Sequence, residues 1–349
     1  MSPLILLLFL LTIFTGTGIV LISSNWFFVW LGLEINTLAF LPLLITTHHP
    51  RATEATTKYF LIQALASALL LFSGLLQASW LNSWDINSPL LPVTTTLLII
   101  AVALKMAIAP CHSWLPDVLQ GLPFRIGLIL STWQKIAPFY ILLILPPQPI
   151  WLYISLGLLS ATLGGWGGLN QTHIRKLLAY SSIAHLGWII TIFPWTPQLS
   201  VLSLLLYFVI TGTLFITLHF LNTFNLADLS NIINFAPWLT TLTLFTTLSL
   251  GGLPPLTGFL SKWLILQELS LNSSFFTATV LIGASLISLF FYLRITYIIL
   301  LSLSPQHTAT SITWRASQNA QLTNIPLATL ICISTIGLIV PPTWLALTF

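Results

Sequence analysis

The chain has 349 residues, of which ten are Lys or Arg and six are Asp or Glu, so only 5% are charged and the net charge is +4. A soluble protein carries roughly 25% charged residues, whereas 56% of this chain is hydrophobic and its mean hydropathy is +0.99. So much apolar side chain has to face lipid, which excludes a soluble enzyme and a disordered chain. The basic residues are scattered rather than clustered, which excludes a protein that binds nucleic acid.

Apolar runs broken by Pro, Gly, Asn and charged residues predict an all-α polytopic membrane protein with about eleven transmembrane helices. The predicted spans are 3–23, 26–46, 58–79, 93–120, 124–145, 151–169, 174–194, 199–222, 236–271, 275–303 and 325–347. The fourth and ninth spans are longer than one crossing requires, and each contains Pro and Gly residues that interrupt a helix. The longest connection, 304–324, is polar and is predicted to lie at the membrane surface.

Positive residues near the span ends fall on one side of the membrane. The loops after even-numbered spans and the adjoining span ends hold Arg51, Lys58, Arg125, Arg175, Lys176, Arg294 and Arg315, whereas the loops after odd-numbered spans hold no Lys or Arg. Because positive residues concentrate inside, the N-terminus is predicted inside and the C-terminus outside. No basic targeting segment precedes the first span, so we expect an organellar form to be made within the organelle.

Four charged residues lie well inside predicted spans. They are Glu34, Lys105, Lys135 and Lys262. A charge at the bilayer centre costs about 2.5–3.5 kcal/mol on insertion scales, so such residues normally face a cavity or a partner group. The alternative, that the side chains extend to the membrane surface, fits poorly with their distance from the helix ends. We therefore predict that these four residues line a polar interior.

Lysine and glutamate at this depth suit proton transfer. A buried ammonium loses solvation and can release a proton near neutral pH, and a nearby carboxylate favours its protonated form. Moving or screening the carboxylate would then switch the proton affinity of the lysine. We predict that the four buried charges form a proton relay. His112 and His185 are further candidates, each with the alternative of a buried, hydrogen-bonded histidine.

Two segments predict interrupted helices. ALKMAIAPCHSWLPD contains Pro110 five residues after Lys105, and LSLGGLPPLTGFLSKW contains glycines and prolines before Lys262. The predicted break residues of the second segment are Gly251, Gly252, Pro254, Pro255 and Gly258. Unwound backbone in a membrane is tolerated only where it lines protein or water, and a simple proline kink is the alternative at Pro110.

The positions of the breaks predict two inverted five-helix repeats, because corresponding broken helices are typical of inverted-repeat transporters. Spans 1–5 (residues 1–145) and spans 6–10 (residues 146–303) each contain one broken helix, in the fourth position. The surface segment and the last span, 304–349, follow as a third region. Sequence identity between the halves is faint, so the repeat rests on layout.

Both broken-helix segments, and NWFFVWLGLEINTLAFLPLL around Glu34, resemble motifs of the antiporter-like subunits of respiratory complex I, the NADH–ubiquinone oxidoreductase. The resemblance covers essentially the whole chain, and its length is similar to the shorter, animal mitochondrial members of the family. The resemblance implies a proton-translocating subunit of the membrane arm that is coupled to NADH:ubiquinone electron transfer in other subunits. The implied location is the mitochondrial inner membrane, with the N-terminus in the matrix and the C-terminus toward the intermembrane space.

The same resemblance implies a role for each buried charge. Glu34 and Lys105 would form an acid–lysine pair, Lys135 would be the connecting lysine, and Lys262 would pass charge toward the next subunit. One departure is that the connecting residue can be His elsewhere in the family. The implied partners are other membrane-arm subunits, including neighbouring antiporter-like subunits, together with accessory subunits and membrane lipids.

The sequence contains no motif for a redox cofactor or a metal. Cys111 and Cys332 form no CxxC pair, and no GxGxxG follows a strand. FMN and iron–sulfur clusters are therefore expected only in partner subunits. The alternative function is a stand-alone cation/proton antiporter, which would be expected to hold Na⁺ with intramembrane Asp or further Glu. Here Glu34 is the one mid-span acid apart from the more peripheral Glu268.

Overall fold

The computed structural model describes residues 3–46, 49–232, 237–254 and 256–301. These residues form α-helices and one short 3₁₀-helix, and extended pairing among them is limited to two isolated bridges, Asn25–Asp85 and His173–Asn225. The predicted surface segment 304–324, the predicted span 325–347 and Pro255 lie outside the described residues.

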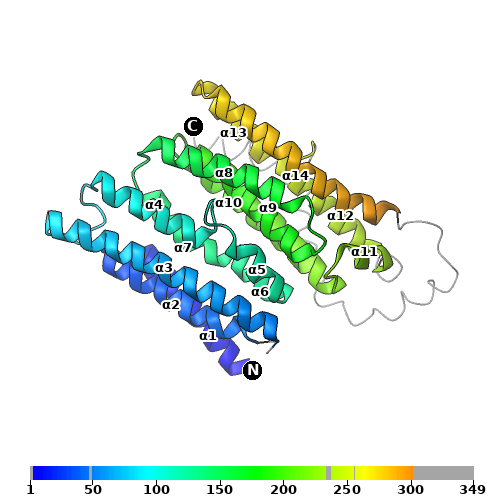
Figure 1. Ribbon diagram of the computed structural model, residues 1–349, viewed down its shortest axis with the longest axis horizontal. Coiled ribbons are helices and arrows are strands. Elements are labelled where there is room, and N and C mark those ends of the chain that lie inside the picture. The colour runs from blue at the N-terminus through cyan, green and yellow to red at the C-terminus, as the bar shows by residue number, and fades with distance from the viewer. Residues whose placement is uncertain (1–2, 47–48, 233–236, 255, 302–349) are drawn as a thin grey trace. The chain divides into compact units, whose positions relative to one another are not determined.

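The chain divides into two compact units between Ser160 and Ala161, inside helix α8 (Ile150–Gly168). The first unit contains α1 (Pro3–Ile22), α2 (Trp26–Leu44), α3 (Pro50–Leu81), α4 (Pro92–Met106), α5 (Trp114–Gly121), α6 (Phe124–Ser131), the 3₁₀-helix Trp133–Lys135 and α7 (Ile136–Ile144). Within it, α2 packs between α1 and α3 (Figure 1).

The second unit is also helical throughout its described part. It contains α9 (Ile174–Ile192), α10 (Pro197–Leu221), α11 (Leu226–Ile232), α12 (Pro237–Gly251), α13 (Thr257–Leu271) and α14 (Phe275–Leu301). Helix α10 contacts α9, α12 and α13, and α14 contacts α9, α11, α12 and α13. Residues of α9, α12, α13 and α14 are therefore brought together in one packed group.

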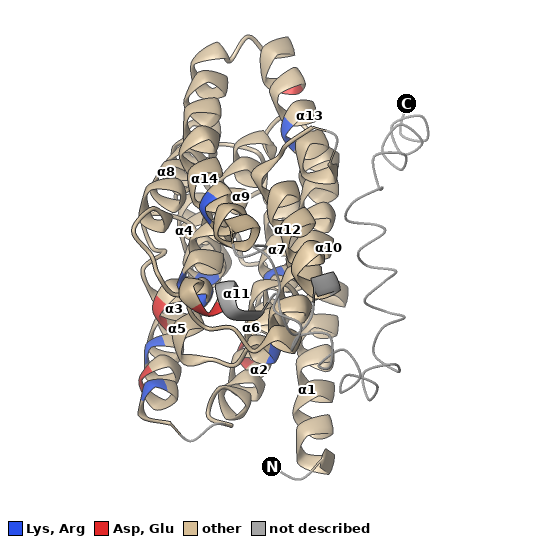
Figure 2. Ribbon diagram, turned by 90° about the vertical axis from the view of Figure 1, so that its right-hand side faces the viewer, with Lys and Arg blue, Asp and Glu red and all other residues tan. Residues whose placement is uncertain are grey.

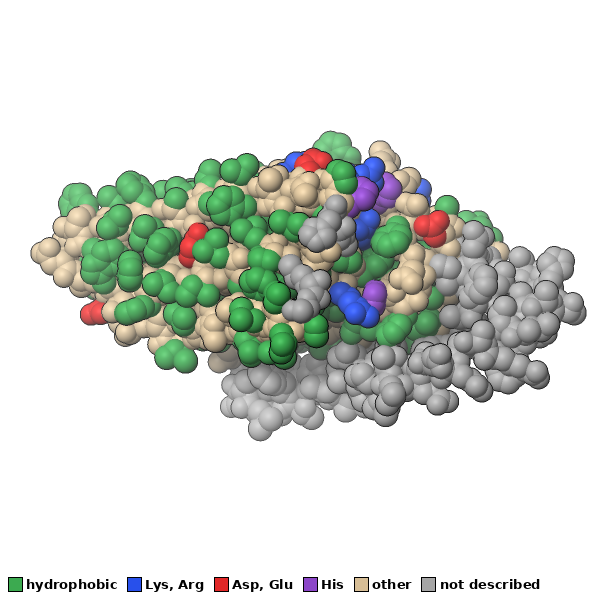
Figure 3. Space-filling view, turned by 90° about the horizontal axis from the view of Figure 1, so that it is seen from below, with side chains coloured by type: hydrophobic (Ala, Val, Ile, Leu, Met, Phe, Trp, Pro, Cys, Tyr) green, Lys and Arg blue, Asp and Glu red, His purple; other side chains and the backbone are tan. Residues whose placement is uncertain are grey.

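Several described helices suit a lipid environment. Seven segments are long and apolar enough to cross a bilayer: α1, α2, α3, Phe124–Ile144, α8, α10 and α14. Shorter apolar helices are Pro92–Met106 and Leu239–Gly251. Large hydrophobic side chains point outward, such as Leu4 (78% exposed) and Phe276 (76% exposed). Hydrophobic side chains are spread over the face in Figure 3, and charged residues are sparse along the ribbons in Figure 2. The chain is therefore a multi-helix membrane protein.

Helix α3 is longer than the predicted span 58–79 because its ends are set by local sequence. Pro50 occupies the first turn, and the Nδ1 atom of His49 accepts a hydrogen bond from the Arg51 amide at 3.2 Å. At the other end, Asn82 adopts a left-handed conformation with φ of 53°. At 1.5 Å per residue the 32-residue helix is about 48 Å long, which exceeds the roughly 30 Å hydrocarbon core.

Two helix pairs are separated by non-helical backbone at the predicted positions. Helix α4 ends at Met106 and α5 begins at Trp114, with Ala107 in the left-handed region at φ 61° and Pro110 between the two helices. Helix α12 ends at Gly251 and α13 begins at Thr257. Gly252 has φ of 79°, a conformation that glycine adopts readily because it lacks a Cβ atom.

The predicted span 124–145 is not one regular helix. The 3₁₀-helix Trp133–Lys135 separates α6 from α7, and Thr132 has φ of −116° and ψ of −72°. Pro138 explains part of this irregularity, because it has no amide hydrogen to donate to the carbonyl of Gln134. Prediction from hydrophobicity missed this feature, since the run stays apolar on both sides of it.

Helix α11 is a further element that the sequence did not predict. It has seven residues and lies between the predicted spans 199–222 and 236–271. Asp228 accepts a hydrogen bond from the Asn225 amide at 2.9 Å, as an acidic residue in the first turn of a helix commonly does. Such a short amphipathic segment leaves little periodicity to detect.

Replacement of Gly258 by Ala tests the close packing of α12 and α13. A Cβ atom at Gly258 would overlap the backbone carbonyl of Ser249. Overpacking of this kind costs about 1–3 kcal/mol or more, so we expect Gly258→Ala to lower the amount of folded, membrane-inserted protein several-fold.

The matched control is Gly283→Ala in α14, where a Cβ atom would meet nothing within 4 Å. Quantitative immunoblotting of membranes compares the two variants. Equal protein levels would show that α12 and α13 separate at little cost.

Candidate functional site

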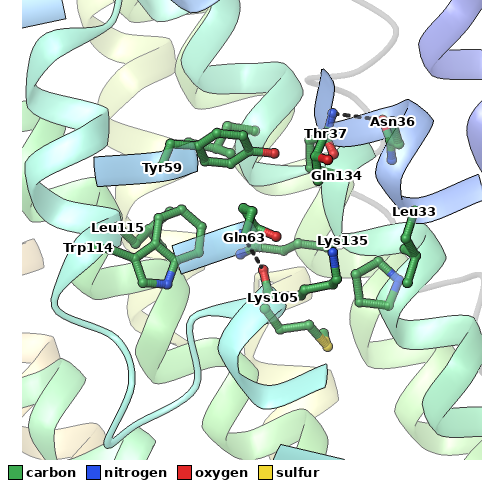
Figure 4. A pocket seen from close by; sticks show the side chains of 13 residues that line it. Leu33, Asn36, Thr37, Tyr59, Gln63, Lys105, Trp114, Leu115, Gln134 and Lys135 are labelled. Atoms are coloured by element: carbon green, nitrogen blue, oxygen red, sulfur yellow. Dashed lines mark hydrogen bonds between the residues drawn. The ribbon is translucent and has the colours of Figure 1, made fainter. Parts of the chain in front are cut away.

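A small cavity with a mixed polar and apolar lining, here called the lysine cavity, lies inside the first unit. It has a volume of about 20 Å³, which is room for about one water molecule. Its polar lining comes from α2, α3, α4 and the 3₁₀-helix, namely Asn36, Thr37, Tyr59, Gln63, Lys105, Gln134 and Lys135. Figure 4 shows these side chains around one space. Two predicted relay lysines, Lys105 and Lys135, therefore share a cavity.

Lys105 stands in the last turn of α4, just before the break. Its side chain is buried, and its Nζ atom has no hydrogen-bond partner among the described residues. The carbonyl groups at this helix end are satisfied by neutral donors: Trp114 Nε1 donates to Leu104 O at 3.2 Å, and Gln63 Nε2 donates to Lys105 O at 3.5 Å. The ammonium is thus left for the cavity, where a water molecule could solvate it.

Lys135 is presented by the irregular turn in the predicted fifth span. It is 3% exposed. The neighbouring Gln134 donates from Nε2 to Asn36 Oδ1 at 3.0 Å, which ties the 3₁₀-helix to α2. Asn36 is buried and cannot hydrogen-bond to bulk water, so Gln134 satisfies its amide oxygen inside the protein. The turn that carries Lys135 is therefore held by a specific contact.

Glu34 acts on the lysine cavity from α2 without lining it. Its charge interacts with Lys105 and with Tyr59, although no direct ion pair between Glu34 and Lys105 occurs among the described residues. The Oε2 atom of Glu34 is buried and has no hydrogen-bond partner among the described residues. The structure thus brings Glu34 within electrostatic range of Lys105.

Lys262 lies in the second unit, at the second helix break. Its Nζ atom donates to the Gly251 carbonyl at the end of α12 at 2.9 Å and lies 6.0 Å from the centroid of the Trp188 ring. The break exposes this carbonyl, because the last carbonyls of a helix lack intrahelical partners. A Cβ atom on Gly252 would come within 2.9 Å of Nζ, so a residue without a side chain suits this position.

The two candidate histidines differ in their surroundings. His185 on α9 lies with Nε2 3.4 Å from Tyr292 Oη, in the second unit. A Cβ atom at Gly251, the residue whose carbonyl accepts the hydrogen bond from Lys262, would lie 3.8 Å from the Tyr292 side chain. His112 is half-buried between α4 and α5, has Nδ1 3.2 Å from Pro110 O, and does not line the lysine cavity.

The sequence reasoning missed the uncharged polar residues of both sites. In the first unit these are Asn36, Tyr59, Gln63 and Gln134, and in the second unit Tyr292. Tyr59 and Gln63 are four residues apart on α3, so both face the same side of the helix. Polar residues at helical spacing inside an apolar run were the available signal. No group of three His, Cys, Asp or Glu able to hold a metal occurs in the described part of the chain.

Comparisons with known proteins agree with this architecture. Residues 23–288 match the family described as NADH:quinone oxidoreductase/Mrp antiporter, TM, and residues 289–345 match NADH dehydrogenase subunit 2 C-terminus. A chain of respiratory complex I from Thermus thermophilus is similar in structure, with a TM-score of 0.81 and 28% identity over 96% of this chain and 79% of that one. A chain of the Mrp complex from a Dietzia species shares the fold, with a TM-score of 0.74 at 18% identity, over 82% of this chain and 59% of that one.

Curated relatives are similar over almost their whole length. NADH-ubiquinone oxidoreductase chain 2 of Squalus acanthias is 51% identical over 90% of this chain and 91% of its own. The same protein of Formosania lacustris is 47% identical over 100% of both chains. The fold and the family match over residues 23–288 define an antiporter-like membrane subunit. Within that class, the chain belongs to the NADH-ubiquinone oxidoreductase chain 2 family.

The Gln134–Asn36 contact can be tested by replacing its partners with Leu. A single replacement leaves the remaining amide without its partner, so Asn36→Leu and Gln134→Leu should each destabilise the subunit by about 1–3 kcal/mol. The double variant should lose clearly less than the sum of the two, because no orphaned amide remains. Heat inactivation of the assembled complex measures all three variants. Strictly additive losses would mean that the two amides do not depend on each other.

Proposed function

We infer that this chain is a proton-translocating, antiporter-like subunit of the membrane arm of respiratory complex I, a NADH:ubiquinone reductase. Its partners are the other subunits of that complex, and its location is the mitochondrial inner membrane. The observation that carries this function is the pair of buried lysines at one water-sized cavity beside a helix break. Similarity to NADH-ubiquinone oxidoreductase chain 2 of two fishes, which extends over 90% or more of this chain, supports the same assignment.

A stand-alone cation/proton antiporter is not favoured. The similarity to an Mrp chain is at 18% identity, which shows the fold alone, whereas the chain 2 relative of Squalus acanthias is 51% identical. Glu34 and the more peripheral Glu268 are both half-buried, and no group of three His, Cys, Asp or Glu residues able to hold a metal ion occurs among the described residues. Electron transfer is assigned to other subunits, which would hold FMN and the iron–sulfur clusters.

We also propose that the chain has eleven spans, arranged as two inverted repeats (1–145 and 146–303) and a terminal region 304–349. Each repeat would contain one broken helix. The pairs α4/α5 and α12/α13 support this layout, because each pair lies beside a buried or half-buried lysine. The N-terminus would face the matrix and the C-terminus the intermembrane space.

Each predicted site residue has a proposed role. Glu34 modulates Lys105 by charge, and Lys105 and Lys135 exchange protons through the water-sized cavity. Lys262 carries charge at the second break, and His185 assists it there. Pro110, Gly251, Gly252, Pro254, Pro255 and Gly258 would keep the breaks open, with Pro255 outside the described residues. His112 has the weakest structural support, because it lies off the cavity.

Cysteine labelling tests the orientation. Thr53 and Asp85 are exposed near opposite ends of α3, which is long enough to reach both membrane surfaces. Thr53→Cys should react with a membrane-impermeant maleimide only from the matrix side, and Asp85→Cys only from the intermembrane side. Intact mitoplasts and inverted inner-membrane vesicles provide the two sides. The opposite labelling pattern would invert the proposed topology.

Lys105→Met tests the relay, because methionine keeps the length of the side chain and removes the proton site. Proton translocation per assembled complex should fall by at least tenfold, because a positioned acid–base group contributes roughly 100- to 10,000-fold. Glu34→Gln should also lower it, and the double variant should be little worse than the worse single variant.

The matched control is Lys58→Met on α3, an exposed lysine that pairs with Glu54 and Asp117 at 2.8 Å. A surface ion pair contributes little, so pumping should stay close to the wild-type rate. Vesicles with a pH-sensitive dye report the rates. Normal pumping by assembled Lys105→Met would contradict the relay.

A further inference from the structure

The last turn of α4, which carries Lys105, is held by two side chains from other helices, here called the clasp. Trp114, the first residue of α5, donates from Nε1 to the carbonyl of Leu104 at 3.2 Å. Gln63 on α3 donates from Nε2 to the carbonyl of Lys105 at 3.5 Å. Helix α4 ends at Met106, so both contacts satisfy carbonyls of its last turn, which lack the usual partners further along a helix. The clasp therefore joins α4 to α5 across the break and to α3 beside it.

Neighbouring aromatic rings fix the orientation of the Trp114 indole. The indole is 4% exposed and lies edge-to-face with Tyr59 on α3, with ring centroids 5.8 Å apart. Tyr59 contacts Phe40 on α2 in the same manner, at 5.5 Å. Rings at such angles and distances attract each other beyond the effect of burial. The indole therefore cannot turn away from Leu104 without disturbing rings on α3 and α2.

The clasp also borders the space that Lys105 enters. Trp114, Tyr59, Gln63 and Lys105 all line the lysine cavity (Figure 4). The indole has one polar hydrogen, which Nε1 donates to the backbone, so Trp114 has no hydrogen left to donate to a water molecule in the cavity. The cavity has a volume of only about 20 Å³. The place of the Lys105 ammonium in so small a space depends on where the last turn of α4 is held.

We propose that Trp114 and Gln63 are positioning residues for Lys105. By holding the last turn of α4 across the break, they keep the Lys105 ammonium within hydrogen-bond distance of a water molecule in the cavity. Proton transfer requires such a distance, about 2.6–3.2 Å between heavy atoms, and a misplacement of about 1 Å can slow a reaction about 100-fold. Neither positioning residue gains or loses a proton in this role. This inference rests on the proposed role of Lys105 in the relay.

The other end of α4 provides a comparison, because α3 holds it with the same kind of side chain. Gln77 on α3 is 1% exposed; its Nε2 atom donates to Pro89 O at 2.7 Å, and its Oε1 atom accepts from Thr94 Oγ1 at 2.9 Å. The 15 residues of α4 place about 22 Å between its two ends. Gln77 therefore stabilises the packing of α3 and α4 without contacting the turn that carries Lys105.

Trp114→Phe removes the indole N–H group and keeps an aromatic ring. In the assembled complex, proton translocation should fall about two- to tenfold, the range expected from the net loss of one hydrogen bond. Gln63→Leu should lower the rate by a smaller factor, because its contact is longer, and it tests the clasp where Trp114→Phe fails to assemble. Wild-type pumping by either assembled variant would overturn the proposal.

Two matched controls remove the same groups elsewhere in the first unit. Trp26→Phe takes the same atoms from a tryptophan that is 2% exposed and whose Nε1 atom has no hydrogen-bond partner among the described residues. Gln77→Leu removes the contacts at the other end of α4. Both controls should pump at the wild-type rate per assembled complex, although Gln77→Leu should be inactivated sooner by heat. A loss of pumping in the controls equal to that in Trp114→Phe would overturn the proposal, because general packing would then explain the effect.

Combination with Lys105→Met separates this proposal from the proposed function. If the clasp acts through Lys105, Trp114→Phe should cause no further loss of pumping in the Lys105→Met background, whereas its effect on heat inactivation should persist there. A further loss of pumping in that background would overturn the positioning role. Normal pumping by Lys105→Met alone would instead contradict the relay. Normal pumping by Trp114→Phe beside an impaired Lys105→Met would overturn this inference and leave the proposed function intact.

Discussion

A helix end that lies inside a bilayer has to find its hydrogen-bond partners within the protein, because the hydrocarbon offers none. This constraint organises both units of the chain. At the end of α4, the carbonyl of Leu104 accepts a hydrogen bond from the Trp114 side chain, and the carbonyl of Lys105 accepts one from Gln63. At the end of α12, the carbonyl of Gly251 accepts a hydrogen bond from Lys262. The donors come from neighbouring elements, so each break holds its unit together instead of weakening it.

The two breaks satisfy the constraint in different ways, which gives their lysines different starting states. In the first unit neutral side chains donate hydrogen bonds to the carbonyls at the end of α4, and the Lys105 side chain lines a cavity of about 20 Å³. In the second unit the lysine itself is the donor to the backbone. In the proposed relay, a proton leaving Lys262 would come from a group hydrogen-bonded to a helix end, whereas the Nζ atom of Lys105 makes no such bond among the described residues. Similar sequence motifs thus produce two sites with different chemistry.

The sequence predicts those features that depend on composition and on rare residues. Hydrophobic runs located the long helices, and Pro and Gly beside lysine located both breaks, because few residue types unwind a helix. The sequence did not predict the 3₁₀-helix Trp133–Lys135, where a single proline disturbs the helix. It also did not predict α11, which is only seven residues long. It also failed at Asn36, Gln63 and Gln134, since an uncharged amide in an apolar run acquires meaning only when its partner is known. That partner lies on another helix, and the sequence contains no direct record of the contact.

These amides show how a membrane interior can hold a few charges in place. An amide hydrogen bond has fixed donors and acceptors and does not change when a proton passes, so the Gln134–Asn36 and Gln63–Lys105 contacts can persist through a cycle. A carboxylate or ammonium in the same structural role would change its hydrogen bonding with each protonation event. Neutral side chains thus fix the backbone of α4 and of the 3₁₀-helix, and the proposed relay assigns proton exchange to the charged side chains. The chain has 16 charged residues in 349, and the hydrogen bonds that fix the end of α4 and the 3₁₀-helix come from side chains that do not titrate near neutral pH.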